Sequence, residues 1–312
     1  MKRSIQLMIS ILGFQAIALS GMAQEEAFSD AGLRESFICY DLAFAVSNPD
    51  TVVGLNLRQQ GYTELPASIG GLYRLEFINA MKNSISVIDP QIGELDHLRI
   101  VNLRQNKLEE LPLTFFKLKK MGELDLGKNS LDTIDYPWNQ LKSLCQLSLT
   151  TNQLVSIPES MTQMKKLMHV DFSRNKIQHL PTGFQRLKHL QSVDASFNQL
   201  SEIPAGLLAN KSLEELVLDN NQLVVLPDAF HPKSSLKVLL ISNNQLTALP
   251  ESICYLDELE TLGLSNNQLT TLPENIGRLK TLKTLILIGN PISKDELERL
   301  RAKLPATKII VE

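Results

Sequence analysis

The 312-residue sequence is poor in aromatic residues and in cysteine, and neither sign of charge dominates it. Aromatic residues make up 5% of the chain, so leucine and isoleucine must fill most of any core. The net charge of −3 comes from acidic and basic residues that are spread along the whole chain. This distribution leaves no basic patch for nucleic acid or for an anionic membrane surface, and we expect no nucleic-acid partner.

Motifs that carry chemistry are missing as well. The sequence has no C-x-x-C or H-x-x-x-H spacing of the kind that binds zinc. It has no glycine-rich phosphate loop and no motif for zinc proteolysis or nucleophilic hydrolysis. We therefore predict a protein without metal, cofactor or catalytic residues.

One long apolar run exists, at the N-terminus. Ile5–Leu19 is mostly apolar, follows Lys2 and Arg3, and is shorter than the roughly 20 residues of a membrane-spanning helix. Small residues precede a cleavage point after Ala23. This pattern predicts a signal peptide over residues 1–23 and a protein that is secreted or held in the cell envelope or periplasm. An uncleaved membrane anchor is the alternative; after cleavage no membrane span is expected.

Leucine recurs at a fixed spacing through the rest of the chain. The stretch LEELVLDNNQLVVLP, residues 213–227, has the pattern L-x-x-L-x-L-x-x-N-x-L-x-x-L-P. Its ninth position recurs every 23 residues, at Asn83, Asn106, Asn129, Asn152, Asn175, Asn198, Asn221, Asn244, Asn267 and Asn290. Gln60 stands one step earlier in flanks that still fit. Residues 51–290 therefore hold eleven units without an insertion.

This pattern resembles the leucine-rich-repeat family, and the resemblance covers residues 51–304. It implies an α/β fold: a right-handed solenoid, or horseshoe, with a parallel inner β-sheet and short helical or 3₁₀ turns outside. It also implies a binding role, since such domains usually recognise other macromolecules with their concave face. The L-P-x-x-I/F form looks like a bacterial and intracellular-scaffold subtype, and with the signal peptide it suggests an exported bacterial version.

The repeat assigns a role to each position of a unit. Positions 4 and 6 should point into the core from a short strand, and positions 3, 5 and 7 should point away from it. The position 9 asparagines should hydrogen-bond to backbone groups that the turn leaves unpaired, which makes them a structural ladder. Position 18 returns to the core, and Trp138 falls there, so core packing is favoured over a binding role. Cys39, Cys145 and Cys254 stand too many strands apart for a disulfide.

Both ends of the repeat need a cover, because a terminal unit would otherwise expose its core. Residues 24–50 are predicted to hold an N-terminal capping helix, since Leu33, Phe37, Tyr40 and Phe44 recur at helical spacing over residues 30–48. Residues 291–312 are predicted to form a C-terminal cap with a helix and a final strand. With both ends covered, we expect no further catalytic domain.

The concave face is the expected site, and two zones stand out on it. An acidic centre holds Glu123, Asp125, Asp171 and Asp194, together with His169. A solvated face or a docking surface for a basic partner is favoured there over a metal site or a catalytic carboxylate pair. Arg174 and Lys128 are expected to neutralise the carboxylates. An apolar strip holds Val217, Val238, Leu240, Ile286 and Ile288. It is a protein-binding patch, a set of side chains that stabilise the sheet, or a surface that a cap segment covers.

These observations favour a non-catalytic, exported binding module that recognises a protein or peptide on its concave face. A glycan-binding surface protein is a second possibility, and the accessory domain of an enzyme complex is a third.

Overall fold

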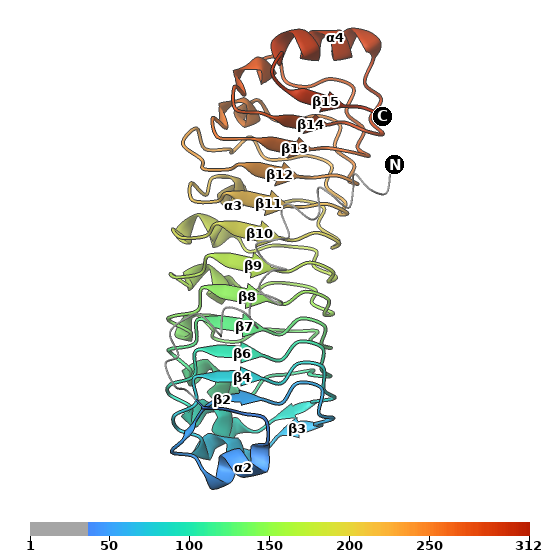
Figure 1. Ribbon diagram of the computed structural model, residues 1–312. Helices are drawn as coiled ribbons and strands as arrows, with labels where there is room; N and C mark the ends of the chain where they lie inside the picture. The colour runs from blue at the N-terminus through green and yellow to red at the C-terminus, as the bar shows by residue number, and fades with distance from the viewer. Residues whose placement is uncertain (1–36) are drawn as a thin grey trace.

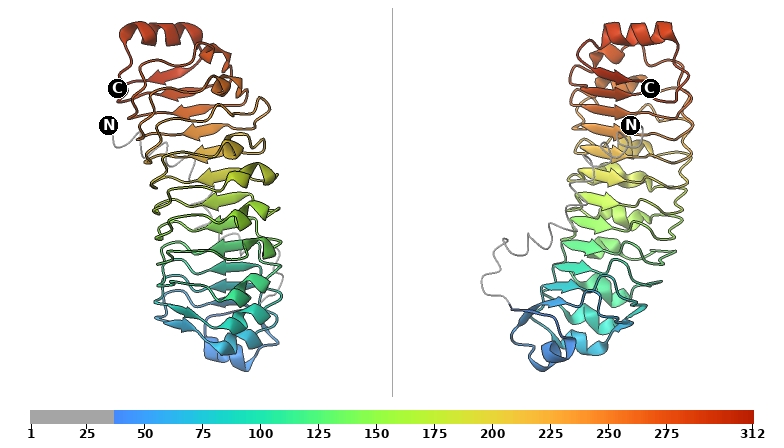
Figure 2. Two further views of the ribbon diagram at one scale, coloured as in Figure 1. Left: turned by 180° about the vertical axis from the view of Figure 1, so that it is seen from behind. Right: turned by 45° about the vertical axis from the view of Figure 1, so that its right-hand side comes forward.

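The computed structural model describes residues 37–312 as one elongated, gently curved stack of repeats (Figures 1 and 2). A single parallel sheet of 13 strands runs along the stack. Its strands in spatial order are β1 (Phe37–Cys39), β2 (Val52–Asn56), β4 (Phe77–Asn79), β6 (Ile100–Asn102), β7 (Glu123–Asp125), β8 (Gln146–Ser148), β9 (His169–Asp171), β10 (Ser192–Asp194), β11 (Glu215–Val217), β12 (Val238–Leu240), β13 (Thr261–Gly263), β14 (Thr284–Ile286) and β15 (Lys308–Ile310). Each of the eleven predicted units contributes one strand, and the predicted solenoid is confirmed.

Short helical turns line the side of the stack opposite the sheet (Figure 2). They are η1 (Ala67–Gly71), η2 (Pro90–Glu94), η3 (Leu113–Lys117), η4 (Trp138–Gln140), η5 (Glu159–Gln163), η6 (Thr182–Arg186), α3 (Ala205–Leu208), η7 (Glu251–Tyr255) and η8 (Ile276–Arg278). Most begin after a proline, which fixes φ and ends the extended segment before it. Two early units also share a second small sheet, β3 (Glu64–Leu65) with β5 (Val87–Ile88).

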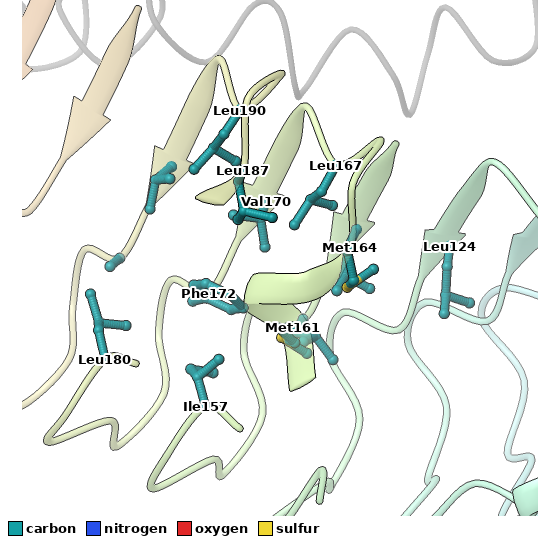
Figure 3. Close-up of a cluster of buried hydrophobic side chains, with 14 of the residues drawn as sticks. Leu124, Ile157, Met161, Met164, Leu167, Val170, Phe172, Leu180, Leu187 and Leu190 are labelled. Carbon is teal, nitrogen blue, oxygen red and sulfur yellow. The ribbon is translucent and has the colours of Figure 1, made fainter. Parts of the chain in front are cut away.

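Leucine, isoleucine and a few larger side chains fill the space between the sheet and the turns. Val170 and Phe172 enter this space from the sheet side, and Met161 enters it from η5 (Figure 3). Trp138 is fully buried, as predicted, and its indole Nε1 donates a 2.9 Å hydrogen bond to the carbonyl oxygen of Ile134. The Phe116 ring packs edge-on against it, with ring centroids 5.2 Å apart. The fourth unit has Asp135-Tyr136-Pro137 where other units have Leu-Pro, and it nevertheless keeps its core.

The chain leaves every repeat strand through a left-handed residue. Position 8 has a positive φ in all eleven units, for example 57° at Thr151 and 54° at Phe197. Non-glycine residues seldom adopt this region, and asparagine accepts it best. Asparagine stands at this position in three successive units, at Asn220, Asn243 and Asn266. The sharp turn delivers position 9 to the interior.

The position 9 asparagines connect neighbouring units through the backbone. The Asn175 amide donates to the carbonyl oxygens of Phe172 in its own unit and Leu149 in the preceding unit, at 2.9 and 3.0 Å. Its Oδ1 accepts from the Leu154 backbone N–H at 3.1 Å. The same three contacts recur at the other ladder positions, as at Asn244. Gln60 differs, because its longer amide reaches the Tyr40 carbonyl oxygen of the N-terminal cap.

The N-terminal cap corrects the prediction of one helix over residues 30–48. Phe37–Cys39 forms β1, which pairs in parallel with β2, and helix α2 (Leu42–Ser47) starts only after Asp41 caps it. Without β1, β2 would be an exposed edge with unpaired backbone groups, so strand pairing overrides the helical spacing of Phe37 and Tyr40. Tyr40 and Phe44 are 63% and 49% exposed and do not face the core.

The C-terminal cap consists of α4 (Lys294–Lys303) and β15. Ser293 caps α4 by accepting a hydrogen bond from the Glu296 N–H at 3.1 Å. Glu296 is buried, pairs with Arg299 at 2.6 Å, and accepts from the Leu272 N–H of the tenth unit at 2.9 Å. No helix in residues 37–312 has the length and apolar character needed to cross a bilayer. The predicted signal peptide lies outside the described residues.

Replacement of Asn175 by alanine should lower the free energy of unfolding by about 2–4 kcal/mol, because it leaves buried backbone groups of two units without partners. Chemical denaturation followed by the fluorescence of Trp138 measures the change. Asn139→Ala is the control, since that amide bonds only the Gln163 side chain at the surface. A cost below about 1 kcal/mol for Asn175→Ala would contradict the role given to the ladder.

Candidate functional site

The concave face of the sheet carries positions 3, 5 and 7 of every unit. Parallel pairing in constant register stacks equal positions, so Asp171 lies beside Asp194, Asp194 beside Val217, and Val217 beside Leu240. The column continues through Gly263 and Ile286 to Ile310 in the C-terminal cap. The position 5 residues of the acidic centre and of the apolar strip therefore belong to one column. The two zones meet in it between β10 and β11.

The column is more enclosed than the sequence suggests. Five of the predicted site residues are buried rather than solvent-facing: Asp171, Asp194, Val217, Leu240 and Ile286. The other five are half-buried: Glu123, Asp125, His169, Val238 and Ile288. Equal positions on adjacent strands lie about 4.8 Å apart, so each side chain is flanked on both sides along the column. The expectation of a fully solvated lane is corrected accordingly.

One oxygen of each carboxylate in the column accepts a backbone hydrogen bond that supports the fold. Oδ1 of Asp171 accepts from the Ser173 N–H at 2.8 Å, and Oδ1 of Asp194 accepts from the Ser196 N–H at 2.8 Å. Asp125 makes the same bond to Gly127. These bonds close the strand end two residues after the carboxylate. The recurring D-x-S and D-x-G spacing was the sequence signal for them, and sequence reasoning missed it.

Compensation of the negative charge differs from the prediction. Arg104, from the preceding unit, lies 3.8 Å from Asp125 Oδ1. The guanidinium of Arg174, which was expected to neutralise the column, instead lies over the Phe197 ring, 4.2 Å from its centroid. Basic charge is therefore placed at the β7 end of the acidic centre.

Burial and mutual repulsion raise the pKa values of the column carboxylates. Desolvation and then the Asp171 charge raise the pKa of Asp194 to about 7. Desolvation likewise raises the pKa of Asp171, and it raises the pKa of Asp219, at position 7 of the next unit, to about 6. Burial also raises the pKa of Glu215 and lowers that of His169. Asp219 extends the acidic centre by a residue that sequence reasoning did not include.

Two polar atoms of this zone are buried without a hydrogen-bond partner, Oδ2 of Asp194 and Nδ1 of His169. They stand on adjacent strands, β10 and β9, and on the same face of the sheet. Since buried polar groups are usually paired, unpaired atoms need an explanation.

The apolar half of the column is continuous. A Cβ atom placed on Gly263 would lie 2.8 Å from Leu240 Cδ2, so the leucine side chain covers the space above the glycine. Ile286 and Ile310 follow on the next two strands. The predicted strip therefore extends into the C-terminal cap, where the repeat pattern no longer shows it.

Metal-ligating and thiol side chains are the other candidate chemical groups in residues 37–312. Within residues 37–312 no three His, Cys, Asp or Glu side chains are grouped so that they could hold a metal ion. Cys39, Cys145 and Cys254 are free thiols, and burial is the main cause that raises the pKa of Cys254 to about 11, which disfavours the reactive thiolate. The column instead presents carboxylate oxygens beside aliphatic side chains.

Comparison with known proteins places the chain in a family. A leucine-rich-repeat family model matches residues 96–154, 142–200, 189–246 and 234–292. These matches cover more than half of the chain, which therefore belongs to the leucine-rich-repeat family. No curated protein matches the chain in sequence.

Solved structures share the architecture. A leucine-rich-repeat protein of Leptospira interrogans is 28% identical, with a TM-score of 0.50, over 88% of this chain and 99% of that one. The ectodomain of the Arabidopsis thaliana receptor kinase GASSHO1/SCHENGEN3, in complex with CASPARIAN STRIP INTEGRITY FACTOR 2, is 25% identical, with a TM-score of 0.59, over 83% of this chain and 34% of that one. An internalin of Listeria monocytogenes, 18% identical with a TM-score of 0.67, covers 85% of this chain and 82% of its own and shares the fold.

Substitution of Asp194 by asparagine should stabilise the protein at neutral pH. Because the pKa of Asp194 is raised from 3.8 to about 7, the folded state binds more protons than the unfolded state between these values. Stability from this group is present below about pH 4 and is lost as the pH rises through 7. Asp194→Asn should raise Tm by roughly 3–8 °C at pH 8 and by much less at pH 4. Calorimetry at both pH values measures this, with exposed Asp132→Asn as control. A pH-independent difference would refute the assignment.

Proposed function

We propose that this protein is a non-catalytic binding module that holds a protein or peptide on its concave face. The observation that carries the proposal is the continuous column of carboxylates and aliphatic side chains on an otherwise uniform scaffold. A structural neighbour, the plant receptor kinase ectodomain in complex with CASPARIAN STRIP INTEGRITY FACTOR 2, supports a macromolecular partner.

Aliphatic side chains and uncompensated carboxylates both favour contact with another molecule. Val238 and Ile288 are half-buried and would bury apolar area against a partner, which is the main favourable term in most protein association. The carboxylates would add charge complementarity and so favour one class of partner over others. Enclosed apolar side chains beside polar ones are typical of the centre of a protein interface.

Half-buried side chains at the edge of the column give the cleanest test. Val238 is on β12 beside Leu240 and lies partly exposed, so Val238→Asp should disrupt binding with a small effect on Tm. We expect immobilised wild-type protein to capture a partner from the native source and Val238→Asp to lose at least 90% of it. Val224→Asp is the matched control, because Val224 is 48% exposed on a loop away from the sheet.

Equal capture by wild type, Val238→Asp and Val224→Asp would place the binding surface elsewhere. A captured molecule that proves to be a glycan would favour the alternative of a glycan-binding surface protein.

We also propose that the protein is exported, with Lys2, Arg3 and the apolar run Ile5–Leu19 acting as a signal peptide. Intact mass measurement of the native protein should give a chain that begins at Gln24. Replacement of Ala23 by leucine should block cleavage and leave the full-length mass, because the −1 position requires a small residue. A native protein that retains Met1–Ala23 would contradict cleavage.

A further inference from the structure

The free half of the Asp194 carboxylate points to a specific ligand group. Asp194 is 2% exposed, and only its Oδ1 is bonded within the protein, to Ser196. Oδ2 is buried and has no partner, and His169 Nδ1 on the next strand shares this condition. Within residues 37–312, the buried side-chain nitrogen and oxygen atoms that lack a partner are these two. A buried acceptor without a donor costs free energy, and a bound donor would recover it.

The negative charge in the column is not required by the fold. Asparagine occupies the same position in earlier units, and Oδ1 of Asn79 and of Asn102 accepts the same bond from the N–H two residues later, at 3.2 and 3.0 Å. An asparagine at 194 could therefore close its strand end without a buried charge. Asp171 and Asp194 thus add charge where an uncharged side chain would serve the scaffold.

The scaffold also leaves the Asp194 charge without a counter-ion. Arg104 is paired with Asp125 and is the positive charge that acts on Asp171, while the guanidinium of Arg174 lies over Phe197. The charged groups that act on Asp194 are Asp171 and Asp219, which both repel it, while Ser196 supplies hydrogen bonds. Two buried carboxylates on adjacent strands therefore face a place where positive charge would be stabilised.

We propose that this place between β9 and β10 receives a cationic side chain of a protein or peptide partner, best an arginine guanidinium, and that aliphatic residues of the same segment lie on Leu240 and Ile286. The inference rests on the proposed function and specifies its partner. A guanidinium has only donors, arranged in a planar fork, so it can donate to Asp194 Oδ2, to Asp171 and to a neutral His169 Nδ1. Arginine is also less strongly hydrated than lysine, which favours it at an enclosed carboxylate pair.

The column sets the spacing of the partner. Leu240 lies two strands from Asp194, and Ile286 lies four strands away. At about 4.8 Å per strand these separations are roughly 10 and 19 Å. A peptide in the polyproline II conformation spans them with about three and six residues, and residues three apart in that conformation lie on the same side. The expected segment therefore carries a basic residue, then an aliphatic residue about three positions away, then another about three positions further.

A synthetic peptide library with this spacing tests the proposal. Each peptide has leucine at the two aliphatic positions, serine or glycine between them, and arginine, lysine or citrulline at the basic position. Citrulline keeps the shape of arginine and removes its charge. We expect the arginine peptides to bind the purified protein at least tenfold more tightly than the citrulline peptides, as measured by fluorescence anisotropy.

Two variants identify the group responsible. Asp194→Asn should reduce the arginine-to-citrulline affinity ratio to nearly one while the variant keeps its folded melting transition. Asp132→Asn is the control and should leave the ratio within threefold of wild type, because Asp132 is exposed and lies outside the column.

Several outcomes would overturn the proposal. They are equal affinity for arginine and citrulline peptides, absence of binding by the whole library, and a charge preference that survives Asp194→Asn. Peptides that bind without charge preference but are lost in Val238→Asp would remove the cation site and leave the concave-face function standing. Peptides that bind equally well to wild type, Val238→Asp and Asp194→Asn would count against both.

Discussion

The hydrogen bonds from each position 9 asparagine to the backbone of two units are the constraint on which the structure depends. One amide donates within its own turn and to the preceding unit, and its oxygen accepts from that preceding unit, as Asn175 shows. The bonds repeat at each step of 23 residues, so every unit meets its neighbour in the same register. Since a solenoid unit contacts only its neighbours, this local rule sets the geometry of the whole stack.

Constant register also brings like residues together. Asp171 and Asp194 are 23 positions apart in the chain and are adjacent in the sheet because the register does not drift. The same rule aligns Val217 with Leu240 and Ile286 with Ile310. Equal positions therefore form columns across the sheet. A substitution at one position of a unit lies beside the same position of the next unit. Burial is the main reason that the pKa of Asp194 is raised, and repulsion from Asp171 in the same column adds to it.

Much of the fold was predictable because each position of the repeat has one structural role. The strands, the outer turns and the burial of Trp138 follow from counting to position 18. Only the first part of the N-terminal capping helix was predicted wrongly, because Phe37 and Tyr40 fit a helical spacing while Phe37–Cys39 pairs as a strand with the open edge of β2. At the candidate site, the sequence predicted which face of the sheet the residues occupy. It did not predict how buried they are or which charges lie beside them. The pairing of Arg104 with Asp125 joins different units, and no single unit reveals it.

The column shows how a repeat protein can hold an unfavourable charge. In a compact domain a buried carboxylate without a donor would strain a single shared core, whereas here units on both sides of β10 keep their own leucine contacts and asparagine bonds. The cost is confined to a few neighbouring units, because interactions do not extend further along the stack. The neighbours in turn keep the carboxylates at a fixed separation of about 4.8 Å. A ligand that bridges them need not order them first, and such preorganisation lowers the entropic cost of binding. The rigidity that the asparagine bonds impose would therefore let the proposed partner use the Asp194 charge for recognition.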